Sequence, residues 1–325
     1  MKKRTLSVIL AAATIIGTMS AGTAAVYADD VKDDYTVGMT LNLGNLTWAE
    51  LAESAKAHGK ELGMNVTVQN SNDDATTQVS QIENFIQANV DAIIVAAVES
   101  NSVEDVCKEA QNAGIKVIAY TQVIENADAE YLVDAYNTGY ACGKRAAEWI
   151  KEVYGDEPIE WALEDLPKYP EIIDRANGIK EAIEELAPNA ELVATQPAEV
   201  MEDGQKNAEN FMQSHPDIKV ICSIGSGGGA GANEGVKSYI SEDEYDKFGI
   251  FGIDATEQEI MNIINGDPQK SSVSLGGGAK HGEMLIDIAE NFREGVEQDK
   301  EQYMPITVID SSNAQEYYDE QYGNK

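Results

Sequence analysis

The sequence predicts an α/β fold with two doubly wound parallel sheets, each forming a Rossmann-like lobe. Short apolar segments that read as buried strands alternate with amphipathic helical segments along the chain. This alternation is typical of right-handed crossovers and parallel sheets. The length of 325 residues is enough for about two domains. The alternation begins again after about residue 135, so two domains of similar design are expected.

The first half of the chain contains four strand segments joined by three helical segments. Thr47 is the expected N-cap of the first helix, and Glu50 three residues later completes a capping box. Ser102 is the expected cap of the third helix. The continuous apolar run at 91–97 is typical of a strand buried on both faces. The predicted strands are 35–43, 66–68, 91–97 and 115–120, and the predicted helices are 48–62, 78–90 and 103–113.

The second half repeats the pattern with six helices and six strands. Thr256 and Glu259 form a second capping box. In open parallel sheets, ligands bind outside the carboxyl ends of the strands, so a site is expected in the loops there. The predicted helices are 138–153, 172–186, 202–213, 232–239, 256–264 and 280–294, and the predicted strands are 159–163, 192–195, 219–224, 249–252, 272–275 and 306–309.

Composition excludes several classes of function. The chain is 43% hydrophobic and 25% charged, a globular balance that excludes a mainly disordered chain. It carries 23 Lys and Arg against 57 Asp and Glu, a net charge of −34. So acidic a surface repels phosphate backbones and anionic lipids, so no nucleic-acid partner and no membrane-surface partner is expected.

The first residues predict an export signal. Lys2, Lys3 and Arg4 are followed by a mostly apolar stretch and then by small residues that end at Ala28. This order fits a signal peptide, residues 1–28, that is cleaved after Ala28. A membrane anchor is the alternative, but the apolar run is interrupted before it reaches the roughly 20 residues that span a bilayer. The mature protein is expected in the periplasm, or outside the cell and associated with its surface.

Cysteines and histidines do not predict catalysis or metal binding. Three cysteines in an exported chain leave at least one free thiol, and all three are expected to be small buried hydrophobic residues. The histidines are far apart and lack the spacing of zinc ligands. We therefore predict no metal, no cofactor and no catalytic residue. The residues concerned are Cys107, Cys142, Cys222, His58, His215 and His281.

Two local patterns point to other functions. Gly225 and Gly227, with Ala230 in the third place, imitate a dinucleotide-binding turn between a strand and a helix. The first strand of the chain has no such turn and no catalytic group stands nearby, so a nucleotide-dependent enzyme is disfavoured. The acidic run 242–246 has the charge of a calcium site but not the spacing and glycine of a calcium loop, so a solvated acidic loop is expected.

The mature chain resembles the type I substrate-binding proteins of ABC importers, in the ribose/galactose-binding group. The resemblance spans essentially the whole mature chain and rests on motifs in a fixed order behind a signal peptide. Each motif is weak alone, and together they are specific. They are the segments 78–86 (QVSQIENFI), 90–95 (VDAIIV), 113–118 (AGIKVI), 175–178 (RANG) and 252–256 (GIDAT).

The resemblance implies a periplasmic binding protein of type I, in which two lobes joined by a three-segment hinge close on one ligand. The chain would cross the hinge near 133–134, 275–276 and 307–308. The N-terminal lobe would then be 29–133 plus 277–307, and the C-terminal lobe 134–276 plus 308–325. The implied partners are a small-molecule ligand and an ABC permease, and a monomer is expected.

The resemblance implies ligand contacts from loops of the first lobe. Asn45 stands at a hydrogen-bonding position and Trp48 at an aromatic one, where the alternative for Trp48 is a core residue of its helix. Tyr120, Thr121 and Gln122 end the fourth strand. Many sugar binders have an Asp-Arg pair at the positions of Thr121 and Gln122. Thr121 and Gln122 are neutral, so this position lacks the charged groups that form paired hydrogen bonds with adjacent hydroxyls. This difference argues against a ribose-like ligand.

In the second lobe, Arg175 matches an arginine that faces the cleft, and a surface ion pair is the alternative. Asp254 matches an acidic ligand contact, and a helix cap is the alternative. Gly225 and Ser226 stand where the family has Asn-Asp, and Gly276 falls near a hinge contact. Glycines let backbone N–H groups approach a ligand. We therefore expect a cleft that relies on backbone donors and has room for a ligand bulkier than ribose.

These observations predict a solute-binding protein that captures a small polar ligand, a sugar or a polyol, for an ABC importer. A binding protein that senses a ligand for a signalling receptor would have the same two lobes that close on one ligand. So would a binding protein for a nucleoside or a cationic metabolite. The sequence leaves these alternatives open.

Overall fold

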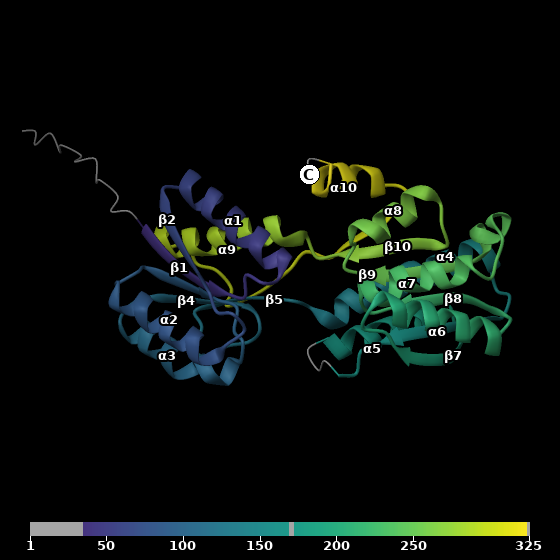
Figure 1. The fold of residues 1–325 in the computed structure, drawn as a ribbon, viewed down its shortest axis with the longest axis horizontal. Coiled ribbons are helices and arrows are strands. Elements are labelled where there is room, and N and C mark those ends of the chain that lie inside the picture. The colour runs from purple at the N-terminus through teal and green to yellow at the C-terminus, as the bar shows by residue number, and fades with distance from the viewer. Residues whose placement is uncertain (1–34, 169–171, 324–325) are drawn as a thin grey trace, which may run out of the picture. The chain divides into compact units, whose positions relative to one another are not determined.

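A computed structural model describes residues 35–168 and 172–323 of the chain (Figure 1). The predicted signal peptide and the cleavage after Ala28 lie outside the described residues. Within the described ranges, no helix combines the length and the apolar character needed to cross a bilayer.

The first sheet has the order β11-β5-β4-β3-β1-β2, and all its strand pairs are parallel. Helices α1 and α9 pack on one face, over a core that contains Met39, Leu51 and Leu285. Helices α2 and α3 cover the other face, over Ile82 and Val103. The strands are β1 (Tyr35–Leu41), β2 (Met64–Asn70), β3 (Ala92–Val95), β4 (Lys116–Thr121), β5 (Ala129–Leu132) and β11 (Glu301–Tyr303). The helices are α1 (Leu46–Glu61), α2 (Ala75–Gln87), α3 (Ser100–Asn112) and α9 (Gly277–Glu294).

The second sheet has the order β12-β10-β9-β8-β6-β7, and only β12 runs antiparallel to its neighbour. Two buried clusters, around Trp149 and Phe251 and around Phe211 and Ile221, hold its helices in place. The strands are β6 (Ile159–Asp165), β7 (Ala190–Pro197), β8 (Ile218–Ser223), β9 (Gly249–Ile253), β10 (Gln269–Ser274) and β12 (Thr307–Asp310). The helices are α4 (Ala135–Tyr154), α5 (Ile173–Leu186), α6 (Met201–Ser214), α7 (Ser226–Lys237), α8 (Glu257–Asn265) and α10 (Ala314–Gln321). The predicted fold class is confirmed.

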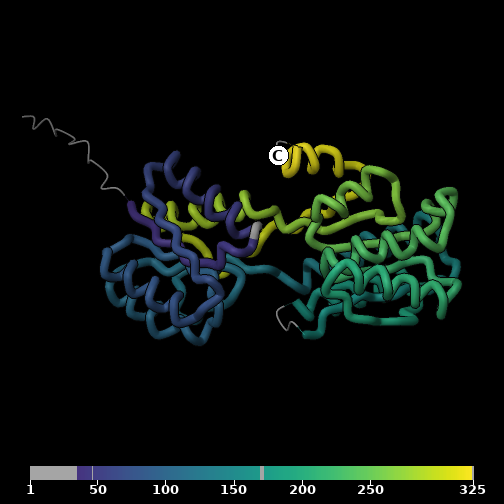
Figure 2. The backbone as a smooth tube through the Cα atoms, viewed as in Figure 1, coloured from purple at the N-terminus to yellow at the C-terminus, as the bar shows by residue number. Residues whose placement is uncertain are grey.

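Three chain segments connect the two sets of elements (Figure 2). They follow β5, β10 and β11, and they lie close together. The Met304 N–H donates to the Leu132 carbonyl at 2.9 Å, and Pro305 lies 3.4 Å from where a Cβ of Gly276 would stand. The third segment reaches the second sheet at Thr307, where β12 begins.

Several local predictions were wrong. Asn45, not Thr47, caps α1, because its Oδ1 accepts the Trp48 N–H at 3.2 Å. Helix α3 begins at Ser100, two residues before its predicted cap Ser102. The short strands β5 and β11 and the C-terminal helix α10 were not predicted. They carry too few periodic apolar residues for a sequence pattern.

Helix α7 begins at Ser226 and includes the glycine run that was predicted to be a loop. The glycines are needed because α6 packs too close for a side chain. A Cβ on Gly227, Gly231 or Gly235 would lie 2.6, 2.2 or 2.6 Å from a backbone oxygen of the segment 199–205. Their spacing of four residues places them on one helix face. These three glycines of the run therefore serve helix packing rather than contact with a ligand.

The resemblance motif at 78–86 lies on α2, and two of its glutamines form hydrogen bonds with groups at the ends of strands. The buried Gln78 donates from Nε2 to the Ala96 carbonyl at 2.9 Å and accepts the Val98 N–H at 2.8 Å. Gln81 accepts the Thr40 hydroxyl at 2.6 Å and donates to a carbonyl at the end of β2. The motif thus satisfies backbone groups where β1, β2 and β3 end.

A Gln78→Met variant is expected to lower the free energy of unfolding by about 2 kcal/mol, because two buried backbone groups lose their partners. Urea denaturation of the mature protein measures the change. Gln87→Met, at an exposed position of the same helix, is the matched control and should leave the midpoint unchanged. If both variants have the same urea midpoint of unfolding, the proposed role of Gln78 at the strand ends is wrong.

The three cysteines are free and buried, as predicted. Burial raises the pKa of the Cys107 thiol to about 12 and also raises that of Cys222. The acidic run at 242–246 forms an exposed 3₁₀ helix, Glu242–Lys247. Among the described residues, no group of three or more His, Cys, Asp or Glu residues could hold a metal ion.

Candidate ligand-binding site

A pocket of about 570 Å³ lies at the carboxyl ends of strands from both sheets. This position is the one expected for ligand binding in open parallel sheets. Tyr120 and Thr121 reach it from the end of β4, and Asp254 reaches it from the end of β9. The full lining is Thr47, Glu50, Tyr120, Thr121, Val133, Ser226, Asp254, Thr256, Glu257, Leu275, Gly277, Gly278, His281, Met304, Tyr317, Gln321 and Tyr322.

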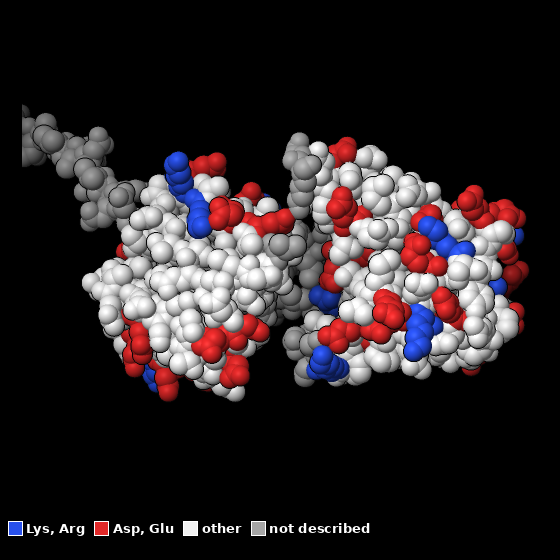
Figure 3. Space-filling view, viewed as in Figure 1, with Lys and Arg blue, Asp and Glu red and all other residues white. Residues whose placement is uncertain are grey.

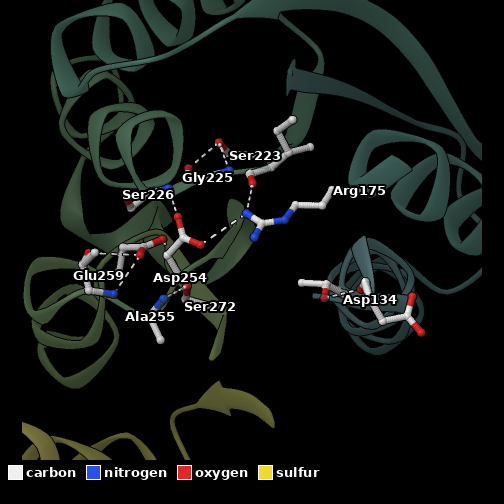
Figure 4. Close-up of polar contacts among 12 residues, drawn as sticks. Asp134, Arg175, Ser223, Gly225, Ser226, Asp254, Ala255, Glu259 and Ser272 are labelled. Carbon is white, nitrogen blue, oxygen red and sulfur yellow. Dashed lines mark hydrogen bonds and ion pairs between the residues drawn. The ribbon is translucent and has the colours of Figure 1, made fainter. Parts of the chain in front are cut away.

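Asp254 is an acidic lining residue that contacts both Arg175 and Ser226 (Figure 4). Its Oδ1 accepts from Arg175 Nη1 at 3.2 Å, and its Oδ2 accepts from the Ser226 N–H at 3.2 Å. Its side chain is 38% exposed, so it keeps lone pairs for a ligand. The N-cap of α8 is Thr256, so Asp254 is not the cap of the helix that follows it. It contacts the first turn of α7 instead.

The backbone at Asp254 is unusual. Its φ is 100°, and that of Ala255 is 47°. Such a conformation is costly for residues other than glycine, and it is found at functional sites when the surroundings enforce it. Here the Ala255 N–H donates to Ser272 Oγ at 2.9 Å, and that hydroxyl donates to Glu259 Oε1 at 3.1 Å. The buried Glu259 thus holds the loop that aims Asp254.

Arg175 is buried, with only 7% of its side chain exposed. Its Nη1 donates to the Ile224 carbonyl at 2.9 Å as well as to Asp254. This burial excludes the alternative of a surface ion pair. Its Nε is buried and has no hydrogen-bond partner among the described residues. Buried donors are almost always paired, so this Nε is a donor that the described residues leave unused.

Two buried acids lie on either side of the first turn of α7. A Cβ on Gly228 would lie 2.5 Å from Glu164 Oε2, and one on Gly229 would lie 2.8 Å from Glu259 Oε1. Desolvation raises the pKa of Glu259 to about 7, and it raises the pKa of Glu164 well above its usual value. The turn that supplies the Ser226 N–H to Asp254 therefore rests on carboxyl groups that burial drives toward the neutral form.

The opposite wall of the pocket is aromatic. Tyr120 is stacked near Tyr131, with ring centroids 6.2 Å apart, and lies 6.0 Å from the His281 ring. Burial lowers the pKa of His281 to about 4, so its ring is neutral at pH 7. Thr121 has a φ of 65°, and its hydroxyl donates to the Tyr120 carbonyl at 2.7 Å. Tyr120, Thr121 and His281 line the pocket from this side.

The structure brings four of the ten predicted site residues into the lining: Tyr120, Thr121, Ser226 and Asp254. Two more of the predicted residues lie next to the lining residue Asp254. Arg175 contacts Asp254, and a Cβ on Gly225 would lie 3.7 Å from Asp254 Oδ2.

The remaining four predicted residues lie outside the lining. Asn45 caps α1. Trp48 packs edge-on against Tyr120, with centroids 6.2 Å apart, and so supports a pocket residue. Gln122 accepts from the Ser100 hydroxyl at 3.0 Å. Gly276 precedes α9 with a φ of 109°, and its neighbours Gly277 and Gly278 line the pocket in its place.

Sequence reasoning missed the residues that the C-terminal helix α10 and its C-cap contribute to the lining. Tyr317, Gln321 and Tyr322 follow no motif of the resemblance. The only sequence signal was the density of tyrosines in the last ten residues. His281 was also missed as a lining residue, because it was considered only as a metal ligand.

The space-filling view shows more acidic than basic side chains on the face drawn (Figure 3). They are spread over the elements of both sheets and do not gather in one patch. The excess of acidic side chains on this face is in keeping with the net charge of −34.

Comparisons with known proteins agree with this geometry. The model of the periplasmic binding protein domain family matches residues 37–291. The chain is 25% identical over 284 residues to the ABC transporter periplasmic-binding protein YphF of Escherichia coli (strain K12), covering 85% of this chain and 84% of that protein. It is 25% identical over 209 residues to the ribose import binding protein RbsB of Bacillus subtilis (strain 168), covering 64% and 67%.

A solved structure shares the fold. The crystal structure of an ABC transporter periplasmic solute binding protein from Actinobacillus succinogenes 130z with bound D-allose superposes with a TM-score of 0.70. The identity is 22%, and the match covers 88% of this chain and 100% of that one.

Proposed function

Because the chain belongs to the periplasmic binding protein domain family, we propose that it captures a small polar ligand, a sugar or a polyol, and presents it to an ABC permease. Membership of a binding-protein family confirms the prediction of a binding protein rather than an enzyme. It also supports export from the cytoplasm.

One observation carries the proposal. The pocket combines the Asp254 carboxylate, which is fixed by two donors, with the aromatic residues Tyr120 and His281 in its lining. Sugars and polyols have adjacent hydroxyls that donate to a carboxylate. Sugar rings also have apolar faces that pack on aromatic rings. A lining of aromatic residues with a few fixed polar groups is the usual design of a small-molecule site.

The ligand-binding residues that we propose are Asp254, Arg175 and Ser226 on one side, and Tyr120 and Thr121 on the other. The Arg175 Nε, which is buried without a partner among the described residues, is a donor for a ligand oxygen. The neutral His281 and the acidic charge of the surface disfavour an anionic ligand.

We propose further that the ligand is enclosed by hinge closure. The lobes would be 29–133 plus 277–307 and 134–276 plus 308–325, with the signal peptide removed after Ala28. A ligand shifts such an equilibrium only by its differential affinity for the closed state. Contacts from Thr121 on one side and Asp254 on the other supply that difference. The mature protein is expected to act as a monomer without nucleic-acid partners.

A thermal-shift screen of the mature protein tests the ligand class. The panel contains monosaccharides, polyols, nucleosides, amino acids and cationic metabolites. A ligand at 100 times its dissociation constant stabilises the native state by about 2.7 kcal/mol, so a sugar or polyol should raise the melting temperature by several degrees. A response only to nucleosides or amines would contradict the ligand class.

A sensing role would use the same pocket. Transport assays with the mature protein and its permease distinguish the two roles, because only the import function requires stimulated uptake of the ligand.

A further inference from the structure

We propose that the C-terminal helix α10 is part of the ligand site, where Gln321 and the ring of Tyr322 contact a bound sugar or polyol. The inference rests on the proposed function and adds a wall to the same pocket. The family model matches residues 37–291, and α10 begins at Ala314. This wall is therefore a candidate for what distinguishes the specificity of this chain.

The helix is fixed to the second set of elements by three tyrosine hydroxyls. Tyr317 Oη is 2.9 Å from Ser274 Oγ at the end of β10. Tyr318 Oη donates to Glu257 Oε1 at 3.1 Å, and Tyr322 Oη donates to the Ala255 carbonyl at 3.0 Å. Ala314 is buried with Ile260 and Ile309 in the cluster beneath the helix. The position of α10 is thus determined by packing and hydrogen bonds.

The anchor of Tyr322 is the residue after Asp254. The carbonyl of Ala255 accepts its hydroxyl, and the side chains of Tyr322 and Asp254 both line the pocket. Two of the tyrosine rings in this wall, Tyr317 and Tyr322, lie 6.4 Å apart in an edge-to-face arrangement. Tyr120 and His281 are aromatic lining residues from the first set of elements. The lining therefore has aromatic residues from both sets.

Gln321 is the polar group of this wall. It lies at the end of α10 and lines the pocket. Its Oε1 would be 3.0 Å from a Cβ on Gly277, the first residue of α9. A primary amide both donates and accepts, which matches a hydroxyl group. The wall thus offers two aromatic residues and one amide, groups that suit the apolar ring faces and the hydroxyls of a carbohydrate.

Titration calorimetry with D-ribose, D-xylose, D-allose and myo-inositol as probes tests the inference. For whichever probe binds the wild-type protein, Gln321→Ala should weaken binding about fivefold, the effect of one neutral hydrogen bond. The matched control is Gln315→Ala. Gln315 lies on the same helix, is exposed and bonds to Asp319, and this variant should bind like the wild type.

Two substitutions of Tyr322 distinguish contact of its ring with the ligand from the hydrogen bond of its hydroxyl that holds α10 in place. Tyr322→Phe removes the hydroxyl that bonds to Ala255 but keeps the ring, and binding should stay within about twofold of the wild type. Tyr322→Ala removes the ring and should weaken binding more than tenfold. Thermal denaturation of each variant shows whether it remains folded at the temperature of the titration.

The outcomes separate the two proposals. Wild-type affinity in both Gln321→Ala and Tyr322→Ala would overturn the role of α10 and leave the proposed function intact. If no probe binds the wild-type protein, the proposed function fails for sugars and polyols, and the role of α10 fails with it. Equal losses in Tyr322→Phe and Tyr322→Ala would show that the hydroxyl only anchors the helix, which also overturns the inference.

Discussion

An Asp254→Ala variant is expected to bind its ligand at least tenfold more weakly than the wild-type protein, a loss of about 1.4 kcal/mol or more. The carboxylate is the one acidic group of the pocket that both Arg175 and the Ser226 N–H hold in place. Its removal takes away the acceptor for adjacent ligand hydroxyls. Titration with the best ligand from the thermal-shift screen measures the effect.

The same substitution should also destabilise the protein by about 2 kcal/mol, because the buried Arg175 loses its counterion. The partial exposure of Asp254 places the effect below that of a fully buried pair. The double variant Asp254→Ala/Arg175→Met removes the unpaired charge, so it should regain stability without regaining affinity.

Asp246→Ala is the matched control for Asp254→Ala. This residue belongs to the exposed acidic 3₁₀ helix, and its loss changes the net charge by the same amount. If both aspartate variants bind like the wild type, the assignment of Asp254 to the ligand is wrong.

A Gly139→Ala variant is expected to lose about 3 kcal/mol of stability. A Cβ at this position would lie 1.9 Å from the carbonyl oxygen of Arg175. That atom is backbone on a facing helix, so the clash is relieved only when α4 and α5 move apart, and overpacking of this kind costs about 1–3 kcal/mol or more. Urea denaturation followed by circular dichroism measures the change.

The variant should affect binding as well, because the residue displaced on α5 is Arg175 itself. Lys144→Ala, at an exposed position of α4, is the control and should be close to neutral. A stability within about 1 kcal/mol of the wild type for Gly139→Ala would show that the helices separate without strain, and it would contradict the packing argument.

The fold was predictable because its signal is repeated many times. Central parallel strands are apolar runs such as 92–95, and most of the long helices have a buried stripe such as Ile82 and Phe85. The predicted start of a helix was wrong where the choice between two neighbouring residues decides which of them is the N-cap. Asn45 and Thr47 are both good N-caps, and only the direction from which the chain enters α1 selects Asn45.

The site was predictable where the motif fixes the backbone. Asp254 follows a buried strand, and its loop conformation depends on Glu259, which lies in the same segment of sequence. The contribution of α10 was not predictable in this way. Its place depends on Ser274, Ala255 and Glu257, which are about 40 to 70 residues away in the chain, and no local pattern records such pairs.

The glycines show why a sequence motif is ambiguous. Gly227 and Gly231 sit in a run that imitates a phosphate-binding turn, but their neighbours in space are backbone atoms of the segment 199–205. A close approach of a ligand and a close approach of a helix both require the absence of a side chain. Only the three-dimensional arrangement separates them.

The burial of all three thiols has a practical consequence for measuring ligand capture. Cys107, Cys142 and Cys222 have no exposed surface, and burial disfavours the thiolate that reacts with alkylating dyes. A single cysteine introduced at the exposed Val123, in the loop that follows β4, would therefore be the preferred site of labelling. The native protein can thus be converted into a fluorescent reporter of its own ligand without first removing any natural cysteine.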